Sequence, residues 1–165
     1  MPTPNRDLRI ERDDLTGQAI ALFLEEHIED MKAISPPESK HALDLEGLRA
    51  PDISFWSVYD GAELVGCGAL KEIDGTWGEI KSMRTSRSRR GQGLGFLVLD
   101  HIVKEAERRG YRRLSLETGS MDFFAPARRL YLRMGFEFCE PFGSYREDPN
   151  SVFMTMTLRA DKLRV

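Results

Sequence analysis

The chain has 165 residues, 41% of them hydrophobic and 31% charged, which is enough to bury the core of one domain and short for two. Its apolar runs fall far below the roughly 20 residues of a membrane-spanning helix, so a soluble protein is expected. Cys67 and Cys139 lie far apart without metal-ligand spacing, and no amino-terminal secretory pattern occurs. These features predict reduced thiols, a cytoplasmic location and no metal site.

The charges are unevenly distributed, although the net charge is only −3. Residues 81–133, here called the basic block, hold 13 Lys and Arg against 5 Asp and Glu, a balance of +8, and the remaining residues have a balance of −11. Such a block is either the solvated surface of helices or a region that binds a polyanion. The negative net charge of the whole chain and the absence of a nucleic-acid-binding motif argue against nucleic acid as that polyanion.

The first half of the chain alternates strand and helix patterns. Strands are expected where apolar and polar residues alternate or aromatic residues gather, over 8–12, 55–59, 63–73 and 77–85. The pair Asp60-Gly61 joins the middle two strands as a hairpin. Thr16 is expected to cap a first helix that ends before Ser35-Pro36-Pro37, and a short second helix is expected over 41–48. The first helix has a partly apolar stripe of Ala19, Leu22, Phe23, Glu26, Ile28 and Met31.

The second half contains the best-defined helix, over 95–109, whose apolar residues recur at helical spacing and which stops at Gly110. A second helix is expected over 126–134 with a stop at Gly135. Strands are expected over 113–118, 136–140 and 152–158. The order of elements is therefore β-α-α-β-β-β-α-β-α-β-β.

The segment Arg90-Gly91-Gln92-Gly93-Leu94-Gly95 lies between a strand and the long helix. Alternate glycines let the backbone approach a ligand closely, and the unpaired N–H groups at a helix start attract phosphate. Phe96 stands where the dinucleotide fingerprint needs glycine, and no Gly-Lys-Ser/Thr follows. The segment therefore predicts a phosphate-binding loop of neither the dinucleotide nor the P-loop class.

The pattern Arg90-x-x-Gly93-x-Gly95 resembles the acyl-CoA-binding signature of the GNAT N-acetyltransferases, Gln/Arg-x-x-Gly-x-Gly/Ala. The strand 79–85 precedes the loop at the family's spacing, and residues 127–136 resemble the family's A-x-x-L-Y-x-x-x-G-F. The order of elements matches as well. The resemblance covers roughly residues 8–158, with the specific motifs confined to 79–95 and 127–136.

The resemblance implies a single GNAT domain over residues 1–165, with its core over about 8–158. Its α/β (α+β) fold would be a mixed, mostly antiparallel sheet of about six or seven strands, flanked by about four helices and splayed between the strands 77–85 and 113–118. Acetyl-CoA would lie in that splay as the co-substrate. Main-chain groups of Met83, Arg84 and Thr85 would hold its pantetheine and thioester.

The diphosphate of acetyl-CoA would lie against the loop and the helix start, formed by Arg90, Gly91, Gln92, Gly93, Leu94, Gly95 and Phe96. CoA would then be the polyanion that the basic block binds, through the side chains of Arg84, Arg87, Arg89 and Arg90. By the same resemblance Tyr131 would protonate the departing thiolate, unless it is simply a core aromatic residue. Glu79 would deprotonate the amine, unless it is only the partner of a cation such as Lys81; His41 and water are alternative bases.

The acceptor would be a primary amine of a small molecule or peptide, attacked directly, because neither cysteine has a paired base in sequence. Acidic residues of the first helices suit a cationic amine or simply solvate a helix: Glu25, Glu26, Glu29, Asp30, Glu38, Asp44 and Glu46. The loop 141–150 would wall the acceptor site or form a homodimer contact. No nucleic acid or membrane is expected as a partner. A non-catalytic acyl-CoA-binding module is the alternative to an enzyme.

Overall fold

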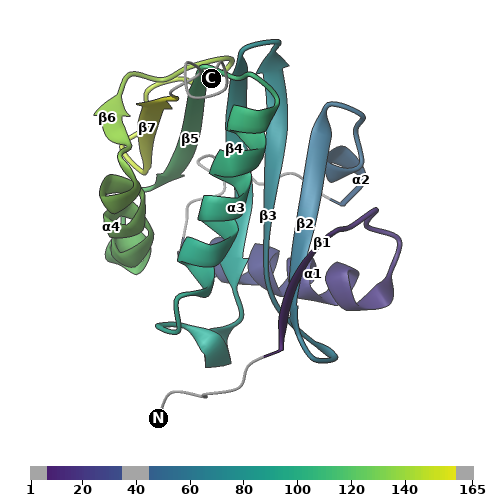
Figure 1. Ribbon diagram of the computed structural model, residues 1–165. Coiled ribbons are helices and arrows are strands. Elements are labelled where there is room, and N and C mark those ends of the chain that lie inside the picture. Colours follow the sequence, from purple (N-terminus) through teal and green to yellow (C-terminus); the bar gives the residue numbers. More distant parts are fainter. Residues whose placement is uncertain (1–6, 35–44, 159–165) are drawn as a thin grey trace.

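The computed structural model describes residues 7–34 and 45–158 and folds them around one seven-stranded sheet with helices on both faces (Figure 1). The strands are β1 (Leu8–Arg12), β2 (Ile53–Asp60), β3 (Glu63–Asp74), β4 (Trp77–Thr85), β5 (Arg113–Gly119), β6 (Glu137–Cys139) and β7 (Ser151–Thr157). The helices are α1 (Gln18–Ile34), α2 (Leu45–Leu48), α3 (Leu94–Arg108) and α4 (Ala125–Met134), with short 3-10 helices η2 (Arg87–Arg89) and η3 (Asp122–Phe124).

The sheet has the order β1-β2-β3-β4-β5-β7-β6, and every neighbouring pair is antiparallel except β4 with β5. The parallel pair follows from the chain path, because α3 carries the chain from the end of β4 back to the start of β5. Only residues 77–80 of β4 pair with residues 113–116 of β5. Beyond these residues the two strands part, which confirms the splayed mixed sheet expected from the sequence.

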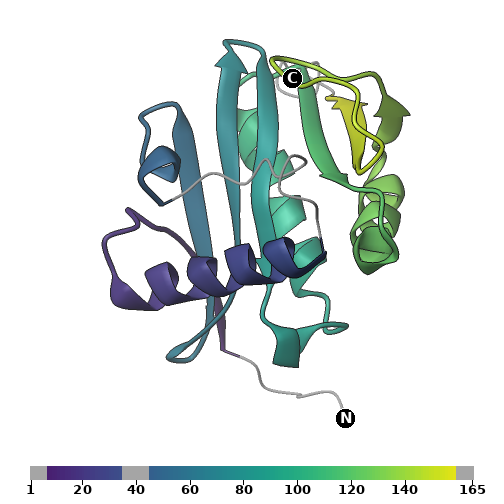
Figure 2. The ribbon, with the colours of Figure 1, turned by 180° about the vertical axis from the view of Figure 1, so that it is seen from behind.

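Two cores hold the helices to the two faces of the sheet. On one face α3 packs through Val98, Leu99 and Ile102 onto a cluster that includes Leu70 and Ile80. On the other face α1 packs onto a smaller cluster, formed by Leu15, Ile20, Phe23, Leu24, Leu48, Phe55, Cys67 and Ala69. Figure 1 shows α3 in front of the strands, and Figure 2, from behind, shows α1 crossing them. Alternation along each strand therefore decides which side chains meet α1 and which meet α3.

The start of α1 differs from the sequence prediction. Thr16 does not begin the helix: its hydroxyl donates to Asp14 Oδ1 over 2.6 Å, and the helix begins at Gln18, with the Gly17 carbonyl accepting from Ala21. The predicted stripe is also rotated, because Leu22 is 58% exposed while Ile20 and Leu24, outside that stripe, are buried. The two helix stops are confirmed, since Gly110 and Gly135 have left-handed φ values of 83° and 117°.

The second helix is present over 45–48, and the remainder of its predicted range, 41–44, lies outside the described residues, as do Glu38, His41 and Asp44. No helix within the described ranges is long and apolar enough to cross a membrane.

Candidate active site

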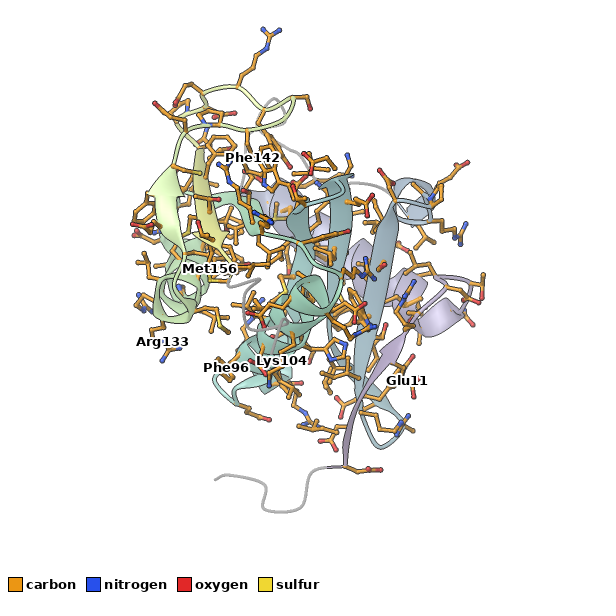
Figure 3. All side chains as sticks on the ribbon, turned by 45° about the horizontal axis from the view of Figure 1, so that its top comes forward. Glu11, Phe96, Lys104, Arg133, Phe142 and Met156 are labelled. Carbon is orange, nitrogen blue, oxygen red and sulfur yellow. The ribbon has the colours of Figure 1, made fainter. Side chains whose placement is uncertain are left out.

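A cleft of about 620 Å³ opens where β4 and β5 part. It is lined by residues of α1, β4, the glycine loop, the start of α3, the end of β5, η3 and α4, and by Tyr145 and Asn150 of the loop before β7. Figure 3 labels Phe96 and Arg133, which border the cleft from α3 and α4, and Phe142, which lies toward the opposite end of the molecule in the loop before β7. Segments distant in sequence thus meet at the splay.

A bulge in β4 shapes the wall of this cleft. Cys67 of β3 pairs with Arg84 and Ala69 pairs with Lys81, so Ser82 and Met83 together oppose Gly68. Ser82 adopts a φ of 55°, which is uncommon for a residue with a side chain. Its carbonyl accepts a hydrogen bond from the Cys67 thiol over 3.2 Å. The bulge removes the backbone of these two residues from the regular ladder with β3, beside the cleft.

The glycine loop turns the chain from β4 into α3. Gly91 and Gly93 have φ values of 79° and 84°, in the left-handed region that glycine adopts without strain. Gly93 caps α3, and its carbonyl accepts from Leu97 N–H over 3.1 Å. The first turn of α3, whose N–H groups have no carbonyl acceptor within the helix, therefore lies at the cleft. Such a terminus favours a negatively charged group.

Eight of the ten residues that the resemblance assigns to the donor line the cleft: Met83, Arg84, Thr85, Arg90, Gly91, Gly93, Gly95 and Phe96. Gln92 and Leu94 do not line it, and the side chain of Leu94 is buried in the core. Gly95 also lets α3 and α4 approach each other, because a Cβ there would lie 3.2 Å from Leu130 Cδ2.

Most of the arginines at the start of the basic block have partners within the protein. Arg84, whose side chain is only 3% exposed, forms salt bridges with Glu26 (2.9 Å) and Asp30 (3.0 Å) of α1. Arg87 also pairs with Asp30. Arg89 pairs with Asp60 (2.8 Å) and Glu63 (2.7 Å) at the β2–β3 turn. Three of the four arginines are therefore paired with carboxylates of the acidic part of the chain.

Arg90 differs from these three arginines. Its side chain is 46% exposed, and its Nη2 lies 4.0 Å from Asp30 Oδ2, at the limit of a salt bridge. Its guanidinium stands 5.2 Å from the centre of the Phe123 ring, which also lines the cleft. Arg90 therefore reaches across one end of the cleft, between α1 and η3, with much of its surface open to solvent.

Tyr131 reaches the cleft from α4. The helix begins with Pro126 in its first turn and packs Tyr131 edge-on against Phe136, with ring centres 5.8 Å apart. Tyr131 is buried yet lines the cleft. Burial first, and the nearby Glu117 carboxylate second, raise the pKa of Tyr131 above its ordinary value. Its hydroxyl is therefore protonated at neutral pH and can donate a hydrogen bond.

Glu79 reaches the cleft from β4 and is only 5% exposed. Its Oε2 accepts hydrogen bonds from Lys81 Nζ over 3.0 Å and from the Tyr145 hydroxyl over 2.6 Å. Glu79 therefore has the cation partner that one alternative expected, and it also borders the cleft, as a base would have to. Tyr145 was missed by sequence reasoning, and its place in the predicted loop 141–150 was the available signal.

Glu79 and Tyr131 lie on opposite faces of the sheet. Ile80 faces the α3 core together with Leu116 and Tyr131, so its neighbour Glu79 faces the α1 side, as does Ala69. The cleft is lined by both residues because it passes between the parted strands. A ligand on the α3 side can therefore meet a ligand on the α1 side within the splay.

α1 adds His27 and Asp30 to the cleft, and sequence reasoning missed His27. Burial, followed by the positive charge of Arg84, lowers the pKa of His27 to about 4, so the imidazole is neutral at neutral pH. Arg87 and Arg84 lower the pKa of Asp30 to about 2. Of the described acidic residues expected to face an amine from the first helices, Asp30 is the one that lines the cleft. Within the same described ranges no cluster of His, Cys, Asp and Glu is arranged to hold a metal ion.

Comparisons with known proteins agree with this architecture. The model of the acetyltransferase (GNAT) family matches residues 20–136. The N-acetyltransferase YsnE of Bacillus subtilis, itself uncharacterised, is 60% identical over 151 residues, which are 92% of this chain and 100% of that protein. The IAA acetyltransferase of Azospirillum brasilense is 36% identical over 92% of this chain and 99% of that protein.

Among solved structures, a GNAT-family acetyltransferase of Staphylococcus aureus superposes with a TM-score of 0.71 at 20% identity, over 92% of this chain and 99% of that one. This likeness concerns the fold, and the family match and the sequence relatives carry the activity. The chain belongs to the GNAT family of acetyltransferases and is an acetyl-CoA-dependent N-acetyltransferase.

Proposed function

We propose that this enzyme acetylates a primary amine of a small molecule or peptide, with Glu79 as the general base and the Tyr131 hydroxyl as the donor to the departing thiolate. The observation that carries the proposal is the cleft through the sheet, because it is bordered by Tyr131 on the α3 side and by Glu79 on the α1 side. Acetyl-CoA would enter from the α3 side. The amine would enter from the α1 side, and the two would meet between β4 and β5.

The glycine loop would hold the diphosphate of acetyl-CoA. The left-handed Gly91 and Gly93 and the start of α3 present backbone N–H groups to the cleft, which supports this assignment. Arg90 would add a charge-assisted contact from the side. The bulge at Ser82 and Met83 supports a second contact, since a backbone N–H of β4 would there stabilise the oxyanion that forms as the amine attacks.

In the reaction the nitrogen lone pair forms a bond to the thioester carbon, and the bond from that carbon to sulfur breaks. Glu79 would accept the proton that the ammonium must lose, and the Tyr131 hydroxyl would donate toward the departing thiolate. Because the pKa of Tyr131 is raised, full proton transfer to a thiolate of ordinary basicity is uphill. Tyr131 would then act chiefly through a hydrogen bond that strengthens as charge develops on sulfur. CoA would leave as the thiolate, and the second proton of the attacking nitrogen would pass to water.

Attack would be direct, without an acetylated cysteine. Cys67 is fully buried against α1, and burial raises the pKa of its thiol to about 12. Cys139 lies on β6, and burial raises the pKa of its thiol as well. A thiol is a nucleophile only as the thiolate, so neither residue is suited to carry the acetyl group.

The α1 side of the cleft carries charges of both signs. Asp30, Glu79 and Glu117 line the cleft, and so do the Lys81 ammonium and the Arg84 guanidinium, which is paired with Asp30. The A. brasilense relative takes its name from the acetylation of IAA, which supports a small acceptor here. The described elements share one sheet, and we infer that the chain acts as a single GNAT domain over 1–165.

The test is thiol release from acetyl-CoA across alkylamines, arylalkylamines, polyamines, amino acids and short peptides. Glu79→Gln is expected to lower kcat by about 100-fold, in the range of a lost general base. Glu72→Gln is the matched control, because Glu72 also accepts a hydrogen bond from a tyrosine, Tyr111 over 2.8 Å, but does not line the cleft. A Glu79→Gln enzyme as fast as wild type would remove Glu79 from the mechanism.

A further inference from the structure

The loop between β6 and β7 is fastened to the α1 side of the sheet by aromatic side chains. Tyr145 packs against Phe142 with ring centres 5.2 Å apart and against Phe153 of β7 at 5.5 Å. Phe142 in turn meets Trp77 of β4 at 5.9 Å. The Tyr145 backbone N–H also donates to the Phe142 carbonyl over 3.1 Å. This packing fixes the position of the Tyr145 ring beside the cleft, which it lines.

The hydroxyl of Tyr145, the Glu79 carboxylate and the Lys81 ammonium form a hydrogen-bonded triangle. The hydroxyl donates to Glu79 Oε2 over 2.6 Å, and Lys81 Nζ lies 3.0 Å from the same oxygen and 3.2 Å from the tyrosine oxygen. All three groups are largely buried. Burial, and then the Glu79 carboxylate, raise the pKa of Tyr145 above its ordinary value, so the phenol stays protonated and remains the donor.

Both donors act on the same oxygen of Glu79. Among the described residues none donates to the other oxygen, Oε1. The carboxylate is thus held through Oε2, while Oε1 is left to take a proton. A base of this kind works only when its carboxylate is fixed within hydrogen-bond reach of the amine.

We propose that Tyr145 is a positioning residue for the acetyl transfer, which holds the Glu79 carboxylate so that Oε1 meets the incoming amine. The proposal rests on Glu79 being the base, as argued above. Tyr145 forms no bond with the acetyl group and donates no proton in the reaction. Its ring, which belongs to a cluster with Phe142 and Phe153, also lines the cleft.

A double-mutant cycle separates this role from simple stabilisation. With 2-phenylethylamine as the probe amine, Tyr145→Phe keeps the ring and is expected to lower kcat by about 10-fold, the scale of one hydrogen bond to a charged group. In a Glu79→Gln background the same change should have almost no further effect, because the carboxylate to be positioned is gone. Tyr111→Phe is the matched control, since Tyr111 loses an equivalent bond to Glu72 outside the cleft.

A second readout needs no acceptor. In protein labelled with 13C at glutamate carboxyl carbons, the Glu79 resonance is identified by its loss in Glu79→Gln. It should move in Tyr145→Phe and stay in place in Tyr111→Phe. An unmoved resonance would overturn the proposal whether or not the probe amine is acetylated.

The two proposals fail in different ways. If Glu79→Gln is slow and Tyr145→Phe is as fast as wild type, Glu79 remains the base and the positioning role is wrong. If Glu79→Gln is as fast as wild type, the assignment of the base fails first, and the positioning role falls with it.

Discussion

At the scale of single residues, Tyr131 combines two properties that a hydrogen-bond donor to a leaving sulfur needs: it borders the cleft and it stays protonated. Tyr131→Phe keeps the ring packed against Phe136 and removes only the hydroxyl. We expect kcat to fall by about 10-fold, because a hydrogen bond that strengthens in the transition state is lost. Steady-state kinetics would check this, together with the dissociation constant of CoA, which should not change. An unaltered kcat would assign Tyr131 to packing alone.

Asp30 is the residue on which the contacts between α1 and the basic block converge, since it pairs with Arg84 and Arg87. Its pKa is lowered to about 2 in the folded protein from 3.8, so its ion pairs contribute stability above about pH 4 and lose that contribution as the pH falls toward 2. Asp30→Asn should therefore lower the free energy of unfolding at pH 7 by about 2 kcal/mol, because Arg84 is buried.

Denaturant unfolding at a series of pH values would check this prediction, and the difference between Asp30→Asn and wild type should narrow below about pH 4. Asp100→Asn is the control, because Asp100 pairs with Lys104 at the surface of α3, where an ion pair contributes little. A difference that stays constant as the pH falls would mean that the charge of Asp30 does not carry the effect.

How far the sequence predicts the site depends on the distance along the chain between the partners. Glu79 and Tyr131 belong to motifs and can be named in advance. Tyr145 and His27 cannot, because Tyr145 meets Glu79 across 66 residues and His27 meets Arg84 across 57. The same reason explains the arginines: local sequence shows a basic block, but only the packing of α1 reveals that Arg84 is neutralised by Glu26 and Asp30.

At the scale of elements, the glycine loop and α3 allow a test that separates the effect of an added charge at the cleft from the effect of backbone strain. Gly93→Asp should weaken CoA binding by about 100-fold, because it places a carboxylate at the helix start where the diphosphate would lie. Gly110→Asp is a matched control. Gly110 has nearly the same φ, 83° against 84°, and like Gly93 has no atom within 4 Å of an added Cβ, but it stands at the far end of α3.

Each variant forces a side chain into the left-handed region, and Gly110→Asp should lose more stability than Gly93→Asp, because the helix dipole favours a carboxylate at the start of α3 and disfavours one at its end. Only Gly93→Asp should lose affinity for CoA in a calorimetric titration. Equal affinities in the two variants would place the diphosphate elsewhere.

Strands and helices were predictable to the extent that local chemistry decides them. The β2–β3 hairpin, the start and end of β4 and the glycine stops of α3 and α4 follow from turn residues and alternation, and they are confirmed. The buried face of α1 was predicted only in part, with Phe23 buried as expected, because the apolar residues of the helix are spread over more than one face. Packing against Phe55 and Ala69 selects Ile20 and Leu24, and leaves Leu22 exposed.

At the scale of the whole molecule, the unequal charge distribution has a structural use. Carboxylates of α1 and of the β2–β3 turn pair with arginines at the end of β4 and just after it, so these three arginines of the basic block tie the two parts of the fold together. The sequence offered two explanations for that block, solvation or a polyanionic ligand, and internal pairing was a third. Attraction of CoA should consequently depend on few side chains, with Arg90 foremost among them.

Two adjacent arginines allow a direct test of whether Arg90 contributes more to CoA binding than an arginine held in internal salt bridges. Arg90→Ala should weaken CoA binding by about 10-fold, because a half-exposed guanidinium at the cleft would contact phosphate, and the loss should shrink at high salt. Arg89→Ala removes the same charge one residue away but breaks the bonds to Asp60 and Glu63. It should leave CoA affinity within about twofold and lower the free energy of unfolding by about 1 kcal/mol. Equal losses of affinity in the two variants, measured by calorimetry at low and high salt, would show that net charge alone attracts CoA and that the salt bridges have no selective effect.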